Sequence, residues 1–225
     1  MGYCKRCNKK GLFVFVNSKG LCAMCASEVS GEYAMRQIDE VYHTSFALMP
    51  QAQKHTICQM LIRKYSDEIS WQNKLAVGLA LAFEGANYRE RAIRKLEEVV
   101  PVFCENALPV SGVGLNGRGK PMYCFTEWEF ISILGELYEK EYRFEDAIAC
   151  YKKLIKLEHS SNFGSYKRIA QVLAKVDINK SVKYWESIRS YKVCKDEEVL
   201  FNHYYQEALD KQAKGYVYRP RNKKQ

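Results

Sequence analysis

The chain has 225 residues, of which 47% are hydrophobic and 27% are charged, so it is long enough and apolar enough to fold around a hydrophobic core. Five prolines and thirteen glycines exclude collagen-like and low-complexity classes. No run approaches eighteen consecutive apolar residues, and no apolar segment follows the basic start of the chain. We therefore expect neither a transmembrane helix nor a secretory signal, no membrane partner, and a cytoplasmic location.

The formal net charge of +9 is concentrated at the two ends. Residues 1–30 hold five basic residues and one acidic residue, and residues 211–225 hold six basic residues and none that is acidic. The intervening residues 31–210 are nearly neutral. Charge at the ends predicts an acidic partner for them: nucleic acid, an anionic surface or an acidic protein. The alternative is that the basic tail is a solvated terminus.

Four of the nine cysteines form two C-x2-C pairs, Cys4 with Cys7 and Cys22 with Cys25, separated by fourteen residues. Each pair can direct two sulfurs at one point, which predicts a tetrahedral four-thiolate metal site. Zinc suits such a site best, and because no ligand position is left for water, we expect a structural zinc ion. Iron on the same four sulfurs is the alternative metal. Disulfides are disfavoured by the missing export signal, and the remaining five cysteines fit buried small hydrophobes.

A β-hairpin is expected between the two cysteine pairs, with a strand over 12–16 and a turn over 17–20. Residues 1–28 resemble the zinc-ribbon or treble-clef class of small zinc modules, which implies binding of nucleic acid or protein. Basic residues around the module are the candidate nucleic-acid contacts: Lys5, Arg6, Lys9, Lys10 and Lys19. Phe13 and Phe15 can stack on bases, but because so short a module builds little core, we expect them to pack in it or against the next domain.

The rest of the chain is expected to be helical. Apolar residues recur with a helical period over 32–46, 51–65, 71–83 and 89–100, and prolines at 50 and 101 mark boundaries. Glycines and prolines then mark residues 101–124 as an insertion, with a weak strand signal over 121–125. A last helix is predicted over 197–214 as a terminal cap.

Residues 134–154 resemble a tetratricopeptide repeat. Gly135, Tyr138, Ala147 and Tyr151 match the small and aromatic positions of that family, and the resemblance implies that Gly135 and Ala147 meet where two helices cross closely. Ile131 departs from the pattern, because the family often has tryptophan there.

Weaker units flank this repeat. Ser181 follows Ala147 by 34 residues, one repeat period, and Ala92 lies in a looser upstream unit. The predicted fold is therefore mostly α: an α-solenoid of tetratricopeptide-like helix hairpins with a small N-terminal zinc-binding β-hairpin module. The expected domains are the module 1–28, the helical domain 29–214 with its insertion, and a basic tail over 215–225. An irregular helical bundle is the alternative.

No catalytic site stands out, and we expect that the protein is not an enzyme. The insertion contains G-x-G-x-x-G over 112–117 and a near P-loop over 114–121, but no strand precedes either motif and Pro121 replaces the magnesium-binding hydroxyl. Arg118 and Lys120 are better interpreted as the tip of a mobile loop. The four histidines fit no metal-binding or catalytic pattern.

The resemblance implies a concave groove lined by residues of the first repeat helix: Glu129, Ser132, Glu136, Glu139 and Lys140. We expect a zinc-containing adaptor that binds a protein segment, preferentially a basic one, in this groove. The alternative is a nucleic-acid-binding regulator that uses the basic module, the loop tip and the tail. Its further contacts are Arg118, Lys120, Arg219, Arg221, Lys223 and Lys224. The tail, with Tyr216 and Tyr218, either stacks on bases or lies in the groove and blocks it.

Overall fold

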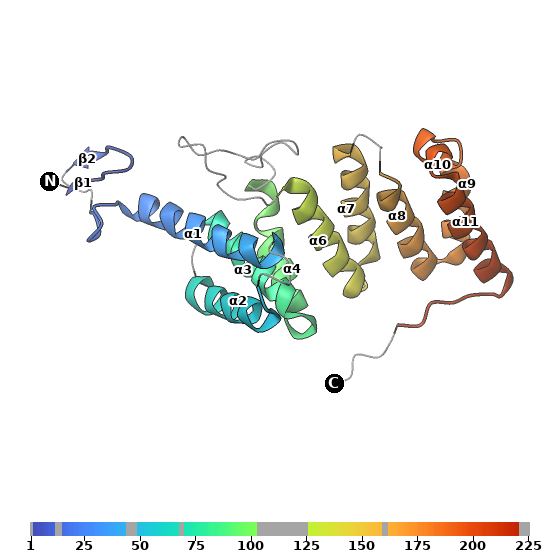
Figure 1. The fold of residues 1–225 in the computed structure, drawn as a ribbon, viewed down its shortest axis with the longest axis horizontal. Coiled ribbons are helices and arrows are strands. Elements are labelled where there is room, and N and C mark those ends of the chain that lie inside the picture. The colour runs from blue at the N-terminus through green and yellow to red at the C-terminus, as the bar shows by residue number, and fades with distance from the viewer. Residues whose placement is uncertain are drawn as a thin grey trace. The chain divides into compact units, whose positions relative to one another are not determined.

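The structure is a computed structural model that describes residues 2–11, 15–43, 49–67, 70–102, 126–158 and 162–220, apart from the side chains of Ser27 and Glu28. The chain divides into two compact units, Met1–Glu127 and Trp128–Gln225, called the N-terminal and C-terminal units below. Figure 1 colours their elements along the chain. None of the helices in the described ranges is long and apolar enough to cross a membrane.

The N-terminal unit begins with a small antiparallel sheet of β1 (Gly2–Tyr3) and β2 (Lys10–Gly11), in which Gly2 lies opposite Gly11. Within the described residues of this unit, four α-helices and one 3-10 turn follow: α1 (Ala23–His43), α2 (Gln51–Tyr65), α3 (Trp71–Glu84), η1 (Ala86–Tyr88) and α4 (Arg89–Glu97). The helical segments expected over 51–65 and 71–83 are confirmed almost to the residue. The helix expected over 32–46 begins earlier, at Ala23, and so includes the fourth cysteine of the metal motif.

Helix α3 is the centre of the N-terminal unit. It contacts α1, α2 and α4, and every residue from Leu75 to Leu81 is buried. A helix that is apolar on all sides fits only inside other helices, which explains why the segment is rich in leucine and alanine. A Cβ atom on Gly78 would lie 2.6 Å from Cδ2 of Leu96 in α4, so the glycine allows these two helices to approach closely.

The described residues of the C-terminal unit form helices joined by short turns, followed by an irregular segment over 216–220. Its elements are α6 (Glu127–Lys140), α7 (Phe144–Leu157), α8 (Phe163–Val176), α9 (Ile178–Ile188), α10 (Lys192–Asp196) and α11 (Glu198–Ala213). Helix α8 contacts α7 and α9, and α9 contacts α11 (Figure 1). Aromatic rings of α8, α9 and α11 form the core here: Phe163, Trp185 and Phe201 are buried, and Trp185 lies 5.4 Å from Phe201 between ring centroids.

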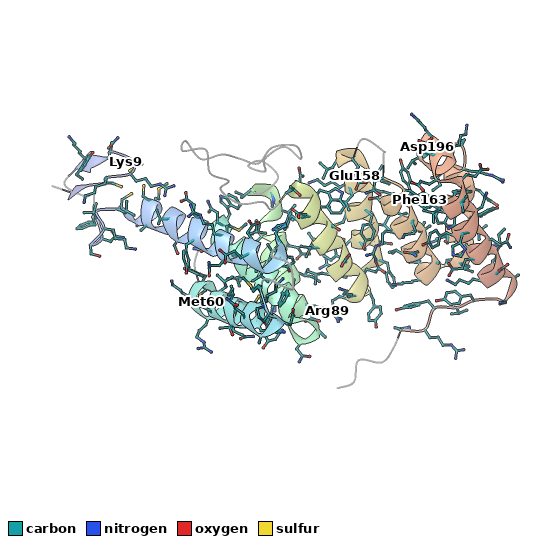
Figure 2. All side chains as sticks on the ribbon, viewed as in Figure 1. Lys9, Met60, Arg89, Glu158, Phe163 and Asp196 are labelled. Carbon is teal, nitrogen blue, oxygen red and sulfur yellow. The ribbon has the colours of Figure 1, made fainter. Side chains whose placement is uncertain are left out.

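Hydrogen bonds to one carboxylate connect the first three helices of this unit. Glu158, which follows α7 and is labelled in Figure 2, accepts hydrogen bonds from Trp128 of α6 and from Asn162 and Ser165 at the start of α8. Asn162 also caps α8, because its side-chain oxygen accepts from the backbone N–H of Gly164 at 2.7 Å. The turn between α7 and α8 is thereby held to α6.

Small residues allow close helix contacts in the C-terminal unit. A Cβ atom on Gly135 of α6 would lie 2.9 Å from Tyr151 and 3.1 Å from Cys150, both in α7. The atoms nearest to Gly135 are thus one turn beyond Ala147, the residue that the sequence places opposite it; Ala147 itself is fully buried. One repeat period later, Ser181 of α9 donates a buried hydrogen bond to the carbonyl oxygen of Ala170 in α8, at 2.8 Å.

A mostly helical body with a small N-terminal two-stranded sheet is therefore confirmed. The strand expected over 12–16 falls mainly on residues outside the described ranges, but its last residue, Val16, forms an antiparallel bridge with Cys22. The sequence did not predict β1 and β2, which lie on either side of the first cysteine pair. The insertion expected over 101–124 is described only as far as residue 102. Helix α1 continues through residue 28, where the sequence places the end of the zinc module.

Replacing Ala147 by phenylalanine tests the packing between helices of the C-terminal unit. The fully buried methyl group leaves no room for a ring, so we expect Ala147→Phe to lower the free energy of unfolding by about 1–3 kcal/mol. For a chain of this size that lowers the midpoint of thermal unfolding by about 2–12 °C. Ala149→Phe is the matched control, because Ala149 is exposed on the same helix. Equal midpoints for both variants would contradict this packing.

Candidate functional site

The four cysteines of the two C-x2-C pairs come together at one point of the N-terminal unit. The sulfur atoms of Cys4, Cys7, Cys22 and Cys25 all lie within 4.8 Å of one another. Cys4 follows β1, Cys7 precedes β2, and Cys25 lies in the first turn of α1. No second group of three or more potential metal ligands occurs elsewhere in the described ranges.

Local backbone turns aim these sulfurs. In the first knuckle Asn8 takes the left-handed conformation (φ 58°), and its N–H donates to the carbonyl oxygen of Cys4 at 3.0 Å. The side-chain oxygen of Asn8 accepts from the hydroxyl of Tyr3. In the second knuckle Gly20 has φ 75°, which glycine adopts without strain. The N–H of Lys5 donates to the carbonyl oxygen of Gly20 at 2.9 Å, and this bond connects the two knuckles.

The four thiols lie in different surroundings. Cys4 and Cys25 are buried, Cys22 is half-buried and Cys7 is exposed. Backbone N–H groups, above all that of Cys22 at 3.3 Å from the sulfur, lower the pKa of the Cys4 thiol to about 6. Burial, and then the neighbouring sulfurs, raise the pKa of Cys25 to about 12. The thiols of Cys4 and Cys25 therefore differ in acidity. When the four sulfurs are deprotonated, a cation bound among them relieves the repulsion between the thiolates.

The spacing of the sulfurs fits a metal ion. In a tetrahedral four-thiolate site with bonds of about 2.3 Å, sulfurs are separated by about 3.8 Å. The sulfurs of Cys7 and Cys22 lie 3.9 Å apart. All cysteines in the described ranges are free thiols rather than disulfides. The residues can therefore hold a metal ion, and four protein ligands leave no open coordination position for substrate.

The basic residues of the module have different neighbours. Arg6 forms an ion pair with Glu32 of α1 at 2.6 Å, and the ammonium group of Lys10 lies 5.3 Å from the ring centre of Tyr3. Lys9 is exposed (Figure 2). The stem of Lys5 packs over Gly20, and Lys19 is exposed beside it.

The two aromatic residues of the module had been expected to pack. Phe15 is 83% exposed, so that prediction is wrong for Phe15. Its ring is therefore available on the surface of the module. Phe13 lies outside the described ranges.

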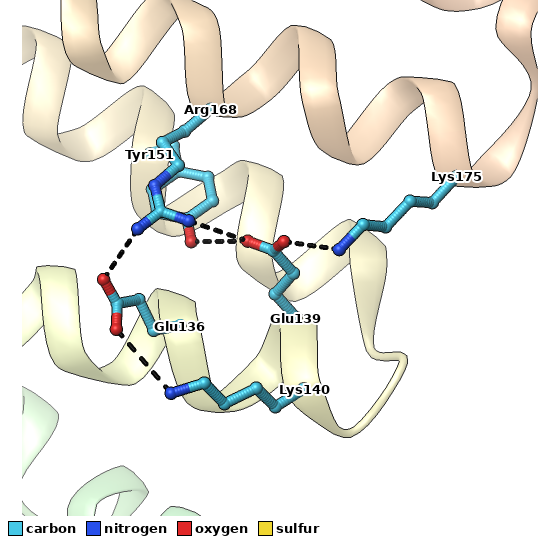
Figure 3. A network of polar contacts seen from close by, with 6 residues as sticks. All are labelled: Glu136, Glu139, Lys140, Tyr151, Arg168 and Lys175. Carbon is cyan, nitrogen blue, oxygen red and sulfur yellow. Dashed lines mark hydrogen bonds and ion pairs between the residues drawn. The ribbon is translucent and has the colours of Figure 1, made fainter. Parts of the chain in front are cut away.

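The residues expected to line a groove lie on α6. Glu129 and Ser132 are half-buried, whereas Lys140 is exposed. Figure 3 shows that the two central carboxylates, Glu136 and Glu139, face cations of α8. Glu136 pairs with Arg168 at 2.9 Å and is 3.8 Å from Lys140.

Glu139 is the more enclosed of the two carboxylates. Its side chain is 13% exposed, and its two oxygens accept from Lys175 at 2.6 Å and from the hydroxyl of Tyr151 at 3.0 Å (Figure 3). Burial and the Glu139 carboxylate raise the pKa of Tyr151, which therefore stays protonated and donates. The surface carries both charges rather than a row of free carboxylates, so a basic ligand has to compete with Arg168 and Lys175.

The C-terminal segment packs against the same unit. Gly215, at φ 64°, ends α11 in a Schellman motif in which the N–H of Tyr216 donates to the carbonyl oxygen of Lys211. The half-buried ring of Tyr216 packs on the aromatic core and lines a cavity of about 280 Å3 between α8, α9 and α11. The segment was expected to be extended after Gly215, and residues 216–220 contain neither helix nor strand.

Tyr218 contacts the turn between α6 and α7. Its ring centre lies 6.0 Å from that of Phe144 and 6.5 Å from that of Tyr142, and the ammonium group of Lys175 lies 5.7 Å from it. Lys175 thus contacts both Glu139 and Tyr218. Val217, between the two tyrosines, is 74% exposed, so alternate residues face the helices.

The remaining predicted contact residues are Arg219, which is exposed, and Arg118, Lys120, Arg221, Lys223 and Lys224, which lie outside the described ranges. Sequence reasoning missed Arg168 and Lys175 as members of the charged surface on α6 and α8. No protein-family model matches the chain, and no curated protein or solved structure is significantly similar to it.

Proposed function

We propose that the protein is a non-enzymatic adaptor, in which a structural zinc ion holds the N-terminal knuckles and the C-terminal unit binds an extended protein segment. The zinc proposal is supported by the sulfur spacing and by the absence of an open ligand position in a four-cysteine set. Zinc is favoured over iron because it prefers tetrahedral sulfur ligands and brings no redox chemistry.

For the C-terminal unit we propose tetratricopeptide-like helix pairs. The supporting observations are the close contact of α6 with α7 at Gly135, and that of α8 with α9 at Ser181 and Ala170. Ala147 and Ser181, one period of 34 residues apart, are both buried in the second helix of their pair. Repeats of this kind present a row of first-helix side chains to a ligand.

The observation that carries the binding proposal is the position of the chain's own C-terminal segment. Residues 216–218 place two tyrosines against the unit and one valine toward solvent, which is the alternation of an extended peptide. Tyr218 is held by Phe144 and by Lys175, a member of the charged network of Figure 3. The surface therefore suits an extended segment with aromatic residues at alternate positions.

The cis segment and a partner segment would compete for this surface. Because the cis segment is tethered, its effective concentration is high, on the order of millimolar for a short link. A partner therefore has to displace Tyr218 before it binds. Only a segment that makes better contacts than the cis segment can do so. In the cis segment, the basic residue Arg219 follows Tyr218 directly. A partner with a basic residue next to its aromatic residue could form ion pairs with the carboxylates of α6.

Metal analysis tests the zinc proposal. We expect one zinc ion per chain in protein purified under reducing conditions, and less than about a tenth of that in Cys22→Ser, because three thiolates leave the tetrahedral site incomplete. Far-ultraviolet circular dichroism of Cys22→Ser should retain most of the helical signal. Cys150→Ser, which alters a half-buried cysteine outside the cluster, is the matched control and should keep its zinc. A metal-free wild-type protein contradicts the proposal.

A labelled peptide of residues 214–220 tests the binding proposal. In the full chain, Tyr218→Ala weakens the cis contact, so we expect the added peptide to bind this variant about tenfold more tightly than the wild type. Fluorescence anisotropy measures both affinities. Val217→Ala is the matched control and should behave as the wild type, because Val217 faces solvent. Equal peptide affinity for all three proteins contradicts the proposal.

A further inference from the structure

A cleft in the N-terminal unit lies beside the second knuckle. It has a volume of about 390 Å3 and is formed by three segments that are far apart in the sequence: the knuckle loop 17–21, the first turns of α1, and the end of α2. Its volume is in the range of about 300–1,000 Å3 that small-ligand sites occupy. None of its lining residues belongs to the surface of the C-terminal unit that Tyr218 contacts.

The cleft combines cations with aromatic rings. Lys19 lines it from the loop, and Lys64 lines it from the last turn of α2. The ammonium group of Lys64 lies 5.5 Å from the ring centre of Tyr33 and 4.9 Å from that of Tyr65. Among the described side chains that line the cleft, none is a carboxylate. The cleft is therefore positively charged.

The two tyrosines play different parts. Tyr65 is only 3% exposed and forms part of the cleft wall beside the ammonium group of Lys64, whereas Tyr33 is 48% exposed, so that much of its ring can be reached from solvent beside the same ammonium group. Near this loop, the stem of Lys5 from the first knuckle packs over Gly20, and Phe15, which precedes the loop, is exposed. The loop itself is fixed, because the side-chain oxygen of Asn17 accepts from the N–H groups of Lys19 and Leu21.

We propose that this cleft binds single-stranded nucleic acid, with a phosphate between Lys19 and Lys64 and a base stacked on Tyr33. Lysines pair with backbone phosphates whatever the nucleotide sequence, and an exposed ring can stack on any base. An acidic peptide would pair with the lysines but would leave the exposed rings unused. A duplex, whose bases are already stacked, would gain nothing from Tyr33. The combination of two cations with the exposed ring of Tyr33 thus favours the single strand.

The test uses the full chain and a fluorescein-labelled ten-nucleotide oligouridylate, whose affinity is measured by anisotropy from about 50 to 200 mM salt. Lys19→Gln with Lys64→Gln should reduce the log–log salt slope by about 0.7, because the one phosphate held between the two lysines is no longer neutralised. Lys152→Gln with Lys156→Gln removes two exposed lysines of the C-terminal unit and should leave the slope unchanged. Equal slopes for the two double variants overturn the proposal.

The aromatic part of the site is tested separately. Tyr33→Leu should lower the affinity for the oligonucleotide about 5- to 150-fold, whereas Tyr33→Phe keeps the ring and should bind as the wild type. Both changes are at a half-exposed position, so the fold is expected to persist. Tyr33→Leu with unchanged affinity overturns the stacking role.

Two further probes identify the class of ligand. A ten-residue polyglutamate peptide and a ten-base-pair duplex should each bind at least about tenfold more weakly than the single strand. Equal or tighter binding of polyglutamate assigns the cleft to acidic peptides and overturns the proposal, as does equal or tighter binding of the duplex. These results are independent of the peptide experiment on the C-terminal unit, so either proposal can fail alone.

Discussion

Close approach of neighbouring helices through small side chains is the constraint on which both units depend. Gly78 admits Leu96 in the N-terminal unit, and Gly135 admits the side chains of Cys150 and Tyr151 in the C-terminal unit. Where two helix backbones approach closely at a small residue, the large side chains on either side fill the space between the helices. Close packing then fixes the positions of these large side chains. Tyr151 is such a residue: it is buried beside Gly135, and its hydroxyl reaches Glu139.

The polar surface of the C-terminal unit follows from this packing. Because α6, α7 and α8 are held together by small residues and by the hydrogen bonds to Glu158, the carboxylates of α6 come within ion-pair distance of Arg168 and Lys175. Exposed ion pairs contribute little to stability, but the enclosed Glu139 fixes where the ammonium group of Lys175 lies. That group in turn contacts Tyr218, so the charged network and the C-terminal segment share one residue.

Features that depend on residues close together in the sequence could be predicted from it. Two C-x2-C pairs predict the cluster of four sulfurs, and apolar periodicity predicts α2 and α3 almost to the residue. The predicted strand over 12–16 lies mainly outside the described residues, and its last residue, Val16, forms a bridge with Cys22. The pair β1 and β2 was not predicted; it forms because the left-handed turn at Asn8 folds the chain back within the first knuckle. An asparagine after a cysteine pair is the signal that would have found that turn.

Contacts between side chains far apart in the sequence could not be predicted from it. Glu139 was expected to face a ligand, but its partner Lys175 lies on the helix after next, 36 residues away, and periodicity does not reveal which lysine of α8 turns toward it. The tail was expected either to stack on bases or to lie in the groove. Tyr218 packs on Phe144 because the Schellman turn at Gly215 sets its direction, which depends on where α11 ends.

The position of Tyr218 is the central claim, because it connects the fold of the C-terminal unit with its proposed binding surface. Nuclear Overhauser spectroscopy of the full chain, with isotopic labels confined to tyrosine and phenylalanine rings, measures that position directly. The structure predicts cross-peaks between the rings of Tyr218 and Phe144, whose centres are 6.0 Å apart. Tyr218 ring signals at their unfolded-chain positions, without cross-peaks to Phe144 or Tyr142, would contradict it.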